Sequence, residues 1–218
     1  MLERRFEKVL NGRLITARLI CGVTEDVLKS GTVAGHAVAT DPPYGIKADK
    51  ANAHSSIRDN DDWPNEGWDE EPPSQEAFDL ILALAPRVAI WGGNYFADKL
   101  PASPGWLYWS KPEAETGFSL ADGELCWTTG KGVVRQKSLP RRDGNLHPTQ
   151  KPVALMGWTL DALKVEAGEV VVDPYMGSGT TAVACIYRGA SFIGIDRSPR
   201  SFAIACQRVE RIFNETLL

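Results

Sequence analysis

The stretch VVVDPYMGSGTT, residues 170–181, decides the fold class. It starts with a short run of β-branched residues, which is typical of a parallel strand buried on both faces of a sheet. A glycine turn follows, and the residues from Ser178 to Arg188 have the apolar periodicity of a helix. A buried strand, a glycine turn and a helix in succession predict an α/β fold, with a ligand site at the carboxyl end of the strand.

Short apolar runs alternate with helical patterns along the rest of the chain, which supports the same fold class. The pattern predicts strands at residues 13–20, 36–40, 87–91, 105–109, 124–128, 170–172 and 192–195. It predicts helices at residues 75–85, 153–164, 178–188 and 199–213, the last with Ser198 as its N-cap. We therefore expect a single domain over residues 1–218, with a mostly parallel seven-stranded sheet and helices on both faces.

Composition excludes several classes of protein. The chain has 218 residues, 43% of them hydrophobic, and a net charge of −4, which is typical of a globular protein and not of a disordered one. No apolar run approaches the roughly 20 residues of a membrane span, and the N-terminus is too charged for a signal peptide, so we expect a cytoplasmic protein without a membrane partner. Four cysteines without a C-x-x-C pair, and only three histidines, predict neither disulfides nor a metal site.

Charge is distributed unevenly over two segments that fit no helix or strand pattern. Residues 48–76 carry nine acidic side chains against two basic ones, and we expect a flexible acidic loop at about 47–74. Residues 130–151 carry six basic side chains against one acidic one, which makes the loop at about 130–146 a candidate for binding a polyanion. A solvated surface loop explains this charge equally well. The candidate contacts to such a polyanion are Lys131, Arg135, Lys137, Arg141 and Arg142.

A first candidate site, Asp41-Pro42-Pro43-Tyr44, follows the strand predicted to end at residue 40. Two consecutive prolines remove two backbone donors, so their carbonyls and the Asp41 carboxylate form a wall of hydrogen-bond acceptors. Such a wall suits a substrate with an NH₂ group, and Tyr44 offers a flat face on which an aromatic base can stack. A plain turn leaving the strand explains the same residues, and the two interpretations are in balance at this point.

The second candidate site is the turn that follows residues 170–172. Gly177 and Gly179 allow a ligand to approach the backbone, and Ser178, Thr180 and Thr181 offer hydroxyls and amides at the start of the helix. Asp173 suits a cationic group. Asp196 ends the next predicted strand, where a carboxylate can accept hydrogen bonds from ribose hydroxyls. A cationic amino-acid group and a ribose together describe S-adenosylmethionine.

Three motifs, taken in their order along the chain, resemble those of the β-class DNA amino-methyltransferases. They are Asp41-Pro42-Pro43-Tyr44, His147-Pro148-Thr149-Gln150-Lys151-Pro152 and Asp173-Pro174-Tyr175-Met176-Gly177-Ser178-Gly179-Thr180-Thr181. In that class the catalytic motif precedes the cofactor motif, which is the permuted order seen here. Trp109-Ser110-Lys111-Pro112 and Gly92-Gly93-Asn94 also fall where the family has weaker motifs.

The resemblance implies a Rossmann-like methyltransferase fold with S-adenosylmethionine as the methyl donor and the exocyclic amine of a DNA base as the acceptor. It assigns catalysis to Asp41, Pro42, Pro43 and Tyr44. It assigns cofactor binding to Thr149, Gln150, Lys151, Asp173, Tyr175, Gly177, Ser178, Gly179, Thr180, Thr181 and Asp196. The family often has Gly-Asp after its first strand, whereas residues 21–26 read CGVTED here, which leaves the acid that would contact the cofactor's adenine open.

Asp41, where related enzymes have Ser, favours adenine N6 as the target, with cytosine N4 as the second choice. Two rival interpretations of the motifs are a DNA-binding subunit without activity and a methyltransferase that acts on RNA or protein amines. The target base must leave the duplex stack to be reached, as is general for methyltransferases. The basic loop is short, so we expect a short or degenerate recognition sequence, or a homodimer that supplies further contacts.

Overall fold

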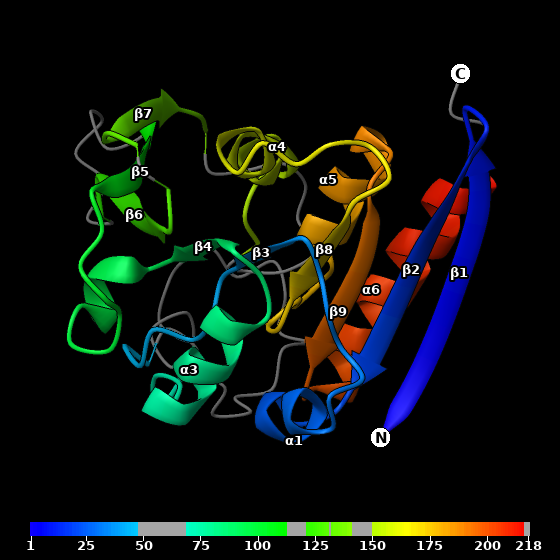
Figure 1. Cartoon of the computed structure of the whole chain (residues 1–218), viewed down its shortest axis with the longest axis horizontal. Helices are drawn as coiled ribbons and strands as arrows, with labels where there is room; N and C mark the ends of the chain where they lie inside the picture. Colours follow the sequence, from blue (N-terminus) through cyan, green and yellow to red (C-terminus); the bar gives the residue numbers. More distant parts are fainter. Residues whose placement is uncertain (48–68, 113–120, 131, 141–149, 216–218) are drawn as a thin grey trace, which may run out of the picture.

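The computed structural model describes residues 1–47, 69–112, 121–130, 132–140 and 150–215 (Figure 1). Within them, nine strands form one sheet in the order β1-β2-β9-β8-β3-β4-β6-β5-β7. The strands are β1 (Leu2–Leu10), β2 (Arg13–Cys21), β3 (Ala37–Thr40), β4 (Arg87–Trp91), β5 (Gly105–Ser110), β6 (Gly123–Thr128), β7 (Arg135–Ser138), β8 (Val170–Asp173) and β9 (Ser191–Asp196). The helices are α1 (Thr24–Lys29), α3 (Gln75–Ala83), the 3₁₀ turn η2 (Gly93–Phe96), α4 (Val153–Ala162), α5 (Thr180–Arg188) and α6 (Pro199–Asn214).

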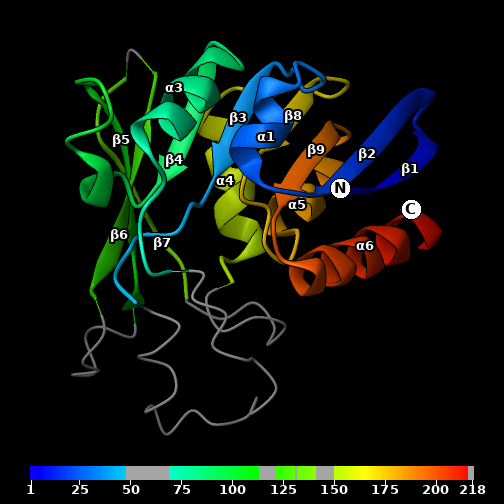
Figure 2. The same cartoon turned by 90° about the horizontal axis from the view of Figure 1, so that it is seen from below.

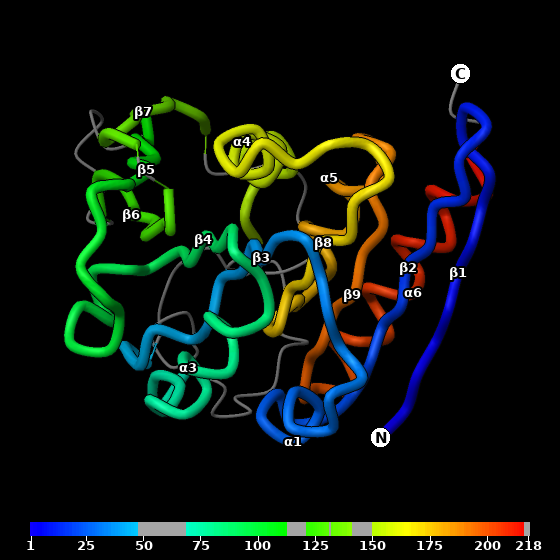
Figure 3. The backbone as a smooth tube through the Cα atoms, viewed as in Figure 1, coloured from blue at the N-terminus to red at the C-terminus, as the bar shows by residue number. Residues whose placement is uncertain are grey.

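The centre of the sheet is parallel, which confirms the expected fold class. β2, β9, β8, β3 and β4 pair in parallel, whereas β1 pairs antiparallel with β2, and β6 pairs antiparallel with both β4 and β5. Figure 3 shows β3 between β4 and β8, although β3 and β8 are far apart in the sequence.

All seven predicted strands are present, and β1 and β7 extend the sheet to nine among the described residues. Neither of the two has an apolar pattern that would have revealed it. β1 reads LERRFEKVL and is at most half-buried along its length, and β7 reads RQKS. Both are the outermost strands of the sheet, and pairing with β2 and β5 defines them.

Helices cover both faces, as expected. On one face, α4, α5 and α6 pack residues such as Leu160, Ile186 and Val209 against the sheet. On the other face, α1 and α3 contribute Leu28 and Phe78 to a second cluster. In Figure 1, α1 and α3 lie below β3 and β8, and α4 lies above them; Figure 2 gives the view from below. None of the helices among the described residues is long and apolar enough to cross a membrane.

The helix boundaries agree with the sequence pattern, with one informative difference. Ser198 caps α6 by accepting a hydrogen bond from the Ser201 N–H, as predicted. The helix α5 begins at Thr180 and not at Ser178, because Gly179 has a φ of +82° and therefore belongs to the turn. The glycine turn is thus longer than the periodicity indicated.

The edge of the sheet at which the parallel strands end combines residues from both the parallel and the antiparallel parts. β3, β8 and β9 end there at Thr40, Asp173 and Asp196. Because β6 runs antiparallel to β4, its first residues, Gly123 and Glu124, lie at the same edge. Ligands bind at this edge in open α/β sheets.

Candidate active site

The two candidate motifs open onto one cavity at the carboxyl edge of the sheet. Its volume is about 890 Å³, within the range of about 300 to 1,000 Å³ that is usual for ligand sites. Asp41 and Pro43 line it from the end of β3, and Asp173 and Asp196 line it from the ends of β8 and β9. The two motifs are far apart in the sequence, but they line one continuous cavity in the fold.

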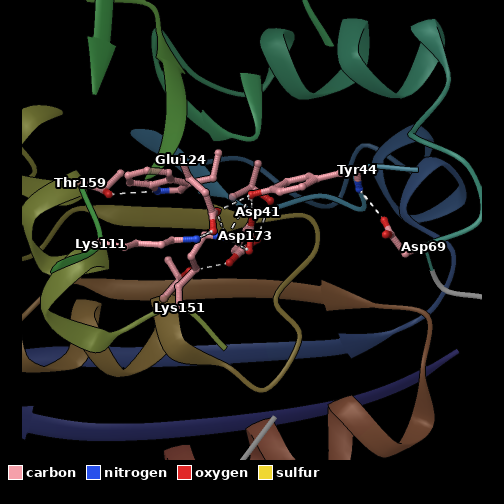
Figure 4. A network of polar contacts seen from close by, with 11 residues as sticks. Asp41, Tyr44, Asp69, Lys111, Glu124, Lys151, Thr159 and Asp173 are labelled. Carbon is pink, nitrogen blue, oxygen red and sulfur yellow. Dashed lines mark hydrogen bonds and ion pairs between the residues drawn. The ribbon is translucent and has the colours of Figure 1, made fainter. Parts of the chain in front are cut away.

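Asp41 lies at the centre of a network of charged side chains. Its Oδ1 accepts a hydrogen bond of 2.6 Å from the Tyr44 hydroxyl, and its Oδ2 lies 2.8 Å from Lys151 Nζ. Burial raises the pKa of Asp41 above its usual range; Lys151 opposes this, and the charge of Glu124 adds to it. Figure 4 shows these side chains converging from separate parts of the chain.

Lys151 lies between two carboxylates. Its Nζ is 2.7 Å from Glu124 Oε2 and donates a hydrogen bond of 3.0 Å to the Tyr44 hydroxyl. The family resemblance implied that Lys151 contacts the cofactor, whereas its amino group in this structure joins the catalytic residues. The side chain also lines the cavity, so the cofactor role stays a prediction.

Glu124 and Lys111 complete the network, and sequence analysis did not assign either to the site. Lys111 Nζ forms an ion pair with Glu124 Oε1. Burial alone would raise the pKa of Glu124, but Lys151 and Lys111 outweigh it and lower this pKa to about 2. No motif in the sequence contains Glu124, and only the position of Lys111 in a weaker family motif indicated a role.

The Tyr44 ring is fixed by aromatic neighbours. It stacks on Tyr95 with ring centroids 4.8 Å apart and meets Phe96 edge-on at 6.0 Å. A Cβ at Gly92 would come within 2.1 Å of the Tyr44 ring, so only glycine fits there. Tyr44 is not among the residues that line the cavity, and stacking of a base on its ring stays a prediction.

Asp69 anchors the backbone of the same loop. Its Oδ1 accepts hydrogen bonds from the N–H groups of Tyr44, at 2.7 Å, and Gly45, at 2.9 Å, and its carbonyl accepts one from the Lys47 N–H. Asp69 is 1% exposed. The sequence predicted that Asp69 lies in a flexible acidic loop, whereas in the structure its side chain is buried and holds the backbone of Tyr44 and Gly45. Residues 48–68 of that loop lie outside the described residues.

Asp173 is buried at the other end of the cavity, and both of its carboxylate oxygens accept hydrogen bonds from other residues of the protein. Its Oδ1 accepts hydrogen bonds from the Thr40 hydroxyl at 2.7 Å and the Tyr175 N–H at 3.1 Å, and its Oδ2 accepts one from the Thr181 hydroxyl at 2.6 Å. Burial raises the pKa of Asp173 to about 7, although these hydrogen bonds oppose the shift. Its role toward a cationic ligand stays a prediction.

The glycine turn has the conformation that its sequence suggests. Gly177 has a φ of +51°, and a Cβ there would meet no atom within 4 Å, so the turn is open beside Gly177. A Cβ at Gly179 would lie 3.0 Å from the Ala205 Cβ, so Gly179 allows α6 to pack closely. Asp196 ties the turn to β9, since its carboxylate accepts hydrogen bonds from the Gly177 and Ser198 N–H groups.

Other predicted cofactor residues lie around the same turn. The Ser178 hydroxyl donates to Gln150 Oε1 at 3.3 Å, and Thr180 Oγ1 accepts a hydrogen bond from Arg208. Tyr175 lines the cavity, and so does Glu25 from α1, which makes Glu25 the acid in residues 21–26 best placed to reach a ligand. Thr149 lies outside the described residues.

The predicted DNA contacts are only partly described. Lys131, Arg141 and Arg142 lie outside the described residues, whereas Arg135 and Lys137 lie on β7. Lys137 pairs with Trp109 near the end of β5, so it lies closer to the carboxyl edge than Arg135, which pairs with Leu107. DNA binding by this strand stays a prediction.

Comparison with known proteins supports the resemblance to DNA methyltransferases that the motifs indicated. A family model described as DNA methylase, for N6 and N4 methyltransferases, matches residues 103–207. The chain is 27% identical over 186 residues to the putative methylase YubD of Escherichia coli K12, covering 76% of this chain and 78% of YubD. It is 44% identical over 64 residues to the type II methyltransferase M2.DpnII of Streptococcus pneumoniae, which covers 29% of this chain but only 24% of that relative.

The fold is also that of a solved methyltransferase. The crystal structure of the M1.HpyAVI–SAM complex superposes with a TM-score of 0.59 at 19% sequence identity, covering 88% of this chain and 98% of that one. The motif order, the sheet and the match to the family model agree, and together they support assignment of the chain to the DNA N6/N4 methyltransferases.

Proposed function

We propose that this protein transfers a methyl group from S-adenosylmethionine to the exocyclic N6 amine of adenine in DNA. The observation that carries the proposal is the single cavity onto which both Asp41 and the turn at Gly177 open. Methyl transfer requires donor and acceptor to meet within van der Waals distance, and a shared cavity provides the place.

The residues around the glycine turn fit S-adenosylmethionine. The open space beside Gly177 accommodates a ligand against the backbone, and Asp173, Asp196 and Glu25 supply carboxylates for its ammonium group and hydroxyls. When bound, S-adenosylmethionine supplies an electrophilic methyl group on a positively charged sulfur. The first turn of α5 beside the site adds backbone donors for a carboxylate group.

The acceptor end has to activate a weak nucleophile, because the lone pair of an aromatic amine is delocalised into the ring. Hydrogen bonds from the amine to the Asp41 carboxylate and the Pro42 carbonyl would localise this lone pair on nitrogen. As the new N–C bond forms, the bond from the methyl group to sulfur would break and leave its electron pair on sulfur. The nitrogen becomes positively charged, and Asp41 can take up the proton that the nitrogen then loses and pass it to water. The raised pKa of Asp41 suits it to this task.

Asp41 favours adenine over cytosine. At the first position of the tetrapeptide, Asp resembles the enzymes that act on adenine N6, and Ser resembles those that act on cytosine N4. Cytosine N4 is the second candidate, since the amines of both bases present two N–H donors. A subunit without activity fits less well, because Asp41, Pro43 and the glycine turn are all present and line one cavity.

Digestion of methylated DNA to nucleosides tests the proposal. Purified protein is incubated with labelled S-adenosylmethionine and unmethylated DNA, RNA or protein, and the products are identified by mass spectrometry. We expect N6-methyladenine from DNA. N4-methylcytosine would select the second candidate, and transfer to RNA or protein alone would contradict the proposal. We also expect a short recognition sequence, and modification confined to sites of about six or more base pairs would contradict that expectation.

A further inference from the structure

Four side chains of alternating charge form a row that leads from the end of β5 to the cavity. Lys111 contacts Glu124, Glu124 contacts Lys151, and Lys151 contacts Asp41. The side chain of Lys111, at the inner end of the row, is 5% exposed, whereas that of Asp41, at the outer end, is 26% exposed. Of the two carboxylates, Asp41 lines the cavity, so the row supports Asp41 from behind.

The ammonium group of Lys151 has three protons, and three acceptors surround it. They are Asp41 Oδ2 at 2.8 Å, Glu124 Oε2 at 2.7 Å and the Tyr44 hydroxyl at 3.0 Å. An ammonium with all of its protons engaged has one preferred orientation. Glu124 therefore determines where Lys151 sits, and Lys151 in turn determines where the Asp41 carboxylate points.

Glu124 itself is held on a rigid element. It lies opposite Trp109 in the antiparallel pairing of β5 and β6. The Lys111 N–H donates to the Asp122 carbonyl, and Lys111 Nζ lies 4.6 Å from the centroid of the Trp109 ring. The Trp109 side chain is fixed in turn by a hydrogen bond of 2.7 Å to the Leu139 carbonyl.

We propose that Glu124 is a positioning residue for methyl transfer, which Lys111 holds in place, and that the pair keeps Lys151 against Asp41 so that the Asp41 carboxylate faces the substrate amine. This inference rests on the proposed function. Glu124 acts through Lys151 and the Tyr44 hydroxyl and not on the substrate itself, because Lys111 uses its Oε1 and Lys151 and Tyr44 use its Oε2.

The alternating charges make opposite predictions for the two members of the pair. The groups that face Asp41 are Lys151 from the segment before α4, Glu124 and the Cys126 thiol from β6, Tyr44 from its own loop, and Asp173 from β8. Removing the charge of Glu124 removes a repulsion, so ionisation of Asp41 becomes easier. Removing the charge of Lys111 leaves the negative charge of Glu124 less balanced, so ionisation of Asp41 becomes harder.

The experiment compares Glu124→Gln, Lys111→Met and the double variant with the wild type. For each protein, kcat and KM for DNA are measured across pH, and cofactor binding is measured by calorimetry. The control is Glu169→Gln, which breaks an ion pair of 2.6 Å with Arg87 at the opposite edge of the sheet. This control exposes any loss of kcat that comes only from a lost half-buried ion pair.

We expect Glu124→Gln to lower kcat by about 100-fold, the loss that a displacement of about 1 Å can cause, with little change in cofactor binding. The acidic limb of its pH profile should move to lower pH, and that of Lys111→Met to higher pH. In the double variant the acidic limb should lie closer to that of the wild type than in Lys111→Met, because the removed positive and negative charges offset each other. Its kcat should stay as low as that of Glu124→Gln, because Glu124 is missing in both. Glu169→Gln should retain the wild-type kcat.

Three results would overturn the inference. The first is a wild-type kcat in Glu124→Gln, and the second is a shift of the acidic limb of the pH profile in the same direction in both single variants. The third is loss of cofactor binding by Glu124→Gln, which would mean a general structural role. Failure of the wild-type protein to methylate DNA would instead overturn the proposed function, so the two failures are distinguishable.

Discussion

The two ends of the cavity are built in different ways. At the cofactor end, Asp173 accepts hydrogen bonds from neutral groups: Tyr175 and Thr181 are two and eight residues away in the chain, and Thr40 is 133 residues away. At the acceptor end, Tyr44 contacts charged residues that are 80 and 107 residues away. One end is therefore held by neutral hydroxyl and backbone groups, two of them close in the chain, whereas the other is a set of ion pairs that forms only in the folded protein.

This difference predicts separate losses of function, and Asp41→Ala should give the largest. The variant removes the carboxylate that accepts the amine proton, so we expect kcat to fall by about 1,000-fold, as when a well-placed charge-stabilising group is lost. Cofactor affinity, measured by calorimetry, should persist because Asp173 and the glycine turn are untouched. Equal activity in Asp41→Ala and wild type would contradict the role of the Asp41 carboxylate in methyl transfer, and with it the division of the cavity into an acceptor end and a cofactor end.

Asp173→Asn tests the cofactor end, and its signature is pH dependence. Because the pKa of Asp173 is raised to about 7, the wild-type carboxylate ionises near neutral pH, and cofactor affinity should rise as pH increases through 7. The sign for stability is opposite. The folded protein holds this proton more tightly than the unfolded chain, so stability without cofactor should fall as pH rises from about 4 to about 7 and level off above that.

In Asp173→Asn, cofactor binding should be about tenfold weaker above pH 7, since a charge-assisted hydrogen bond is lost, and its pH dependence should flatten. Titration calorimetry at several pH values measures both effects. An unchanged pH dependence would show that another group controls binding.

Asp69→Ala sharpens the comparison, because it disturbs the acceptor end without removing a charge that touches the substrate. The N–H groups of Tyr44 and Gly45 would lose their acceptor, which costs about 1 to 3 kcal/mol for each donor that stays buried. We expect a lower melting temperature and a reduced kcat with unchanged cofactor affinity. Asp79→Ala, at an exposed position on α3, is the control and should change neither quantity.

Lys137→Gln should have the smallest effect and tests the surface beyond the cavity. If Lys137 contacts a DNA phosphate, the slope of log affinity against log salt should decrease by about 0.9, with kcat at saturating DNA unchanged. Lys164→Gln, at the opposite edge of the sheet, is the control. An identical salt dependence in Lys137→Gln and wild type would exclude Lys137 from the DNA contact.

The same difference explains what the sequence could predict. Residues 170–181 predicted a strand, a turn and a helix because each of these is determined by neighbours in the chain, and the seven predicted strands are all present. β1 and β7 have no apolar pattern, so only their pairing defines them. Glu124, Lys111 and Asp69 were not assigned to the site for a related reason, since a charged residue in a strand or loop looks solvated until the fold supplies its partner.

The most direct test of the central claim is a crystal structure of the protein with S-adenosylhomocysteine and a short DNA that contains the target base. We expect the adenosyl group to lie against Gly177 and Asp196, and the amine of an extruded base to lie within hydrogen-bond distance of Asp41 in the same cavity. A cofactor bound elsewhere, or a target amine that contacts neither Asp41 nor Pro42, would contradict it.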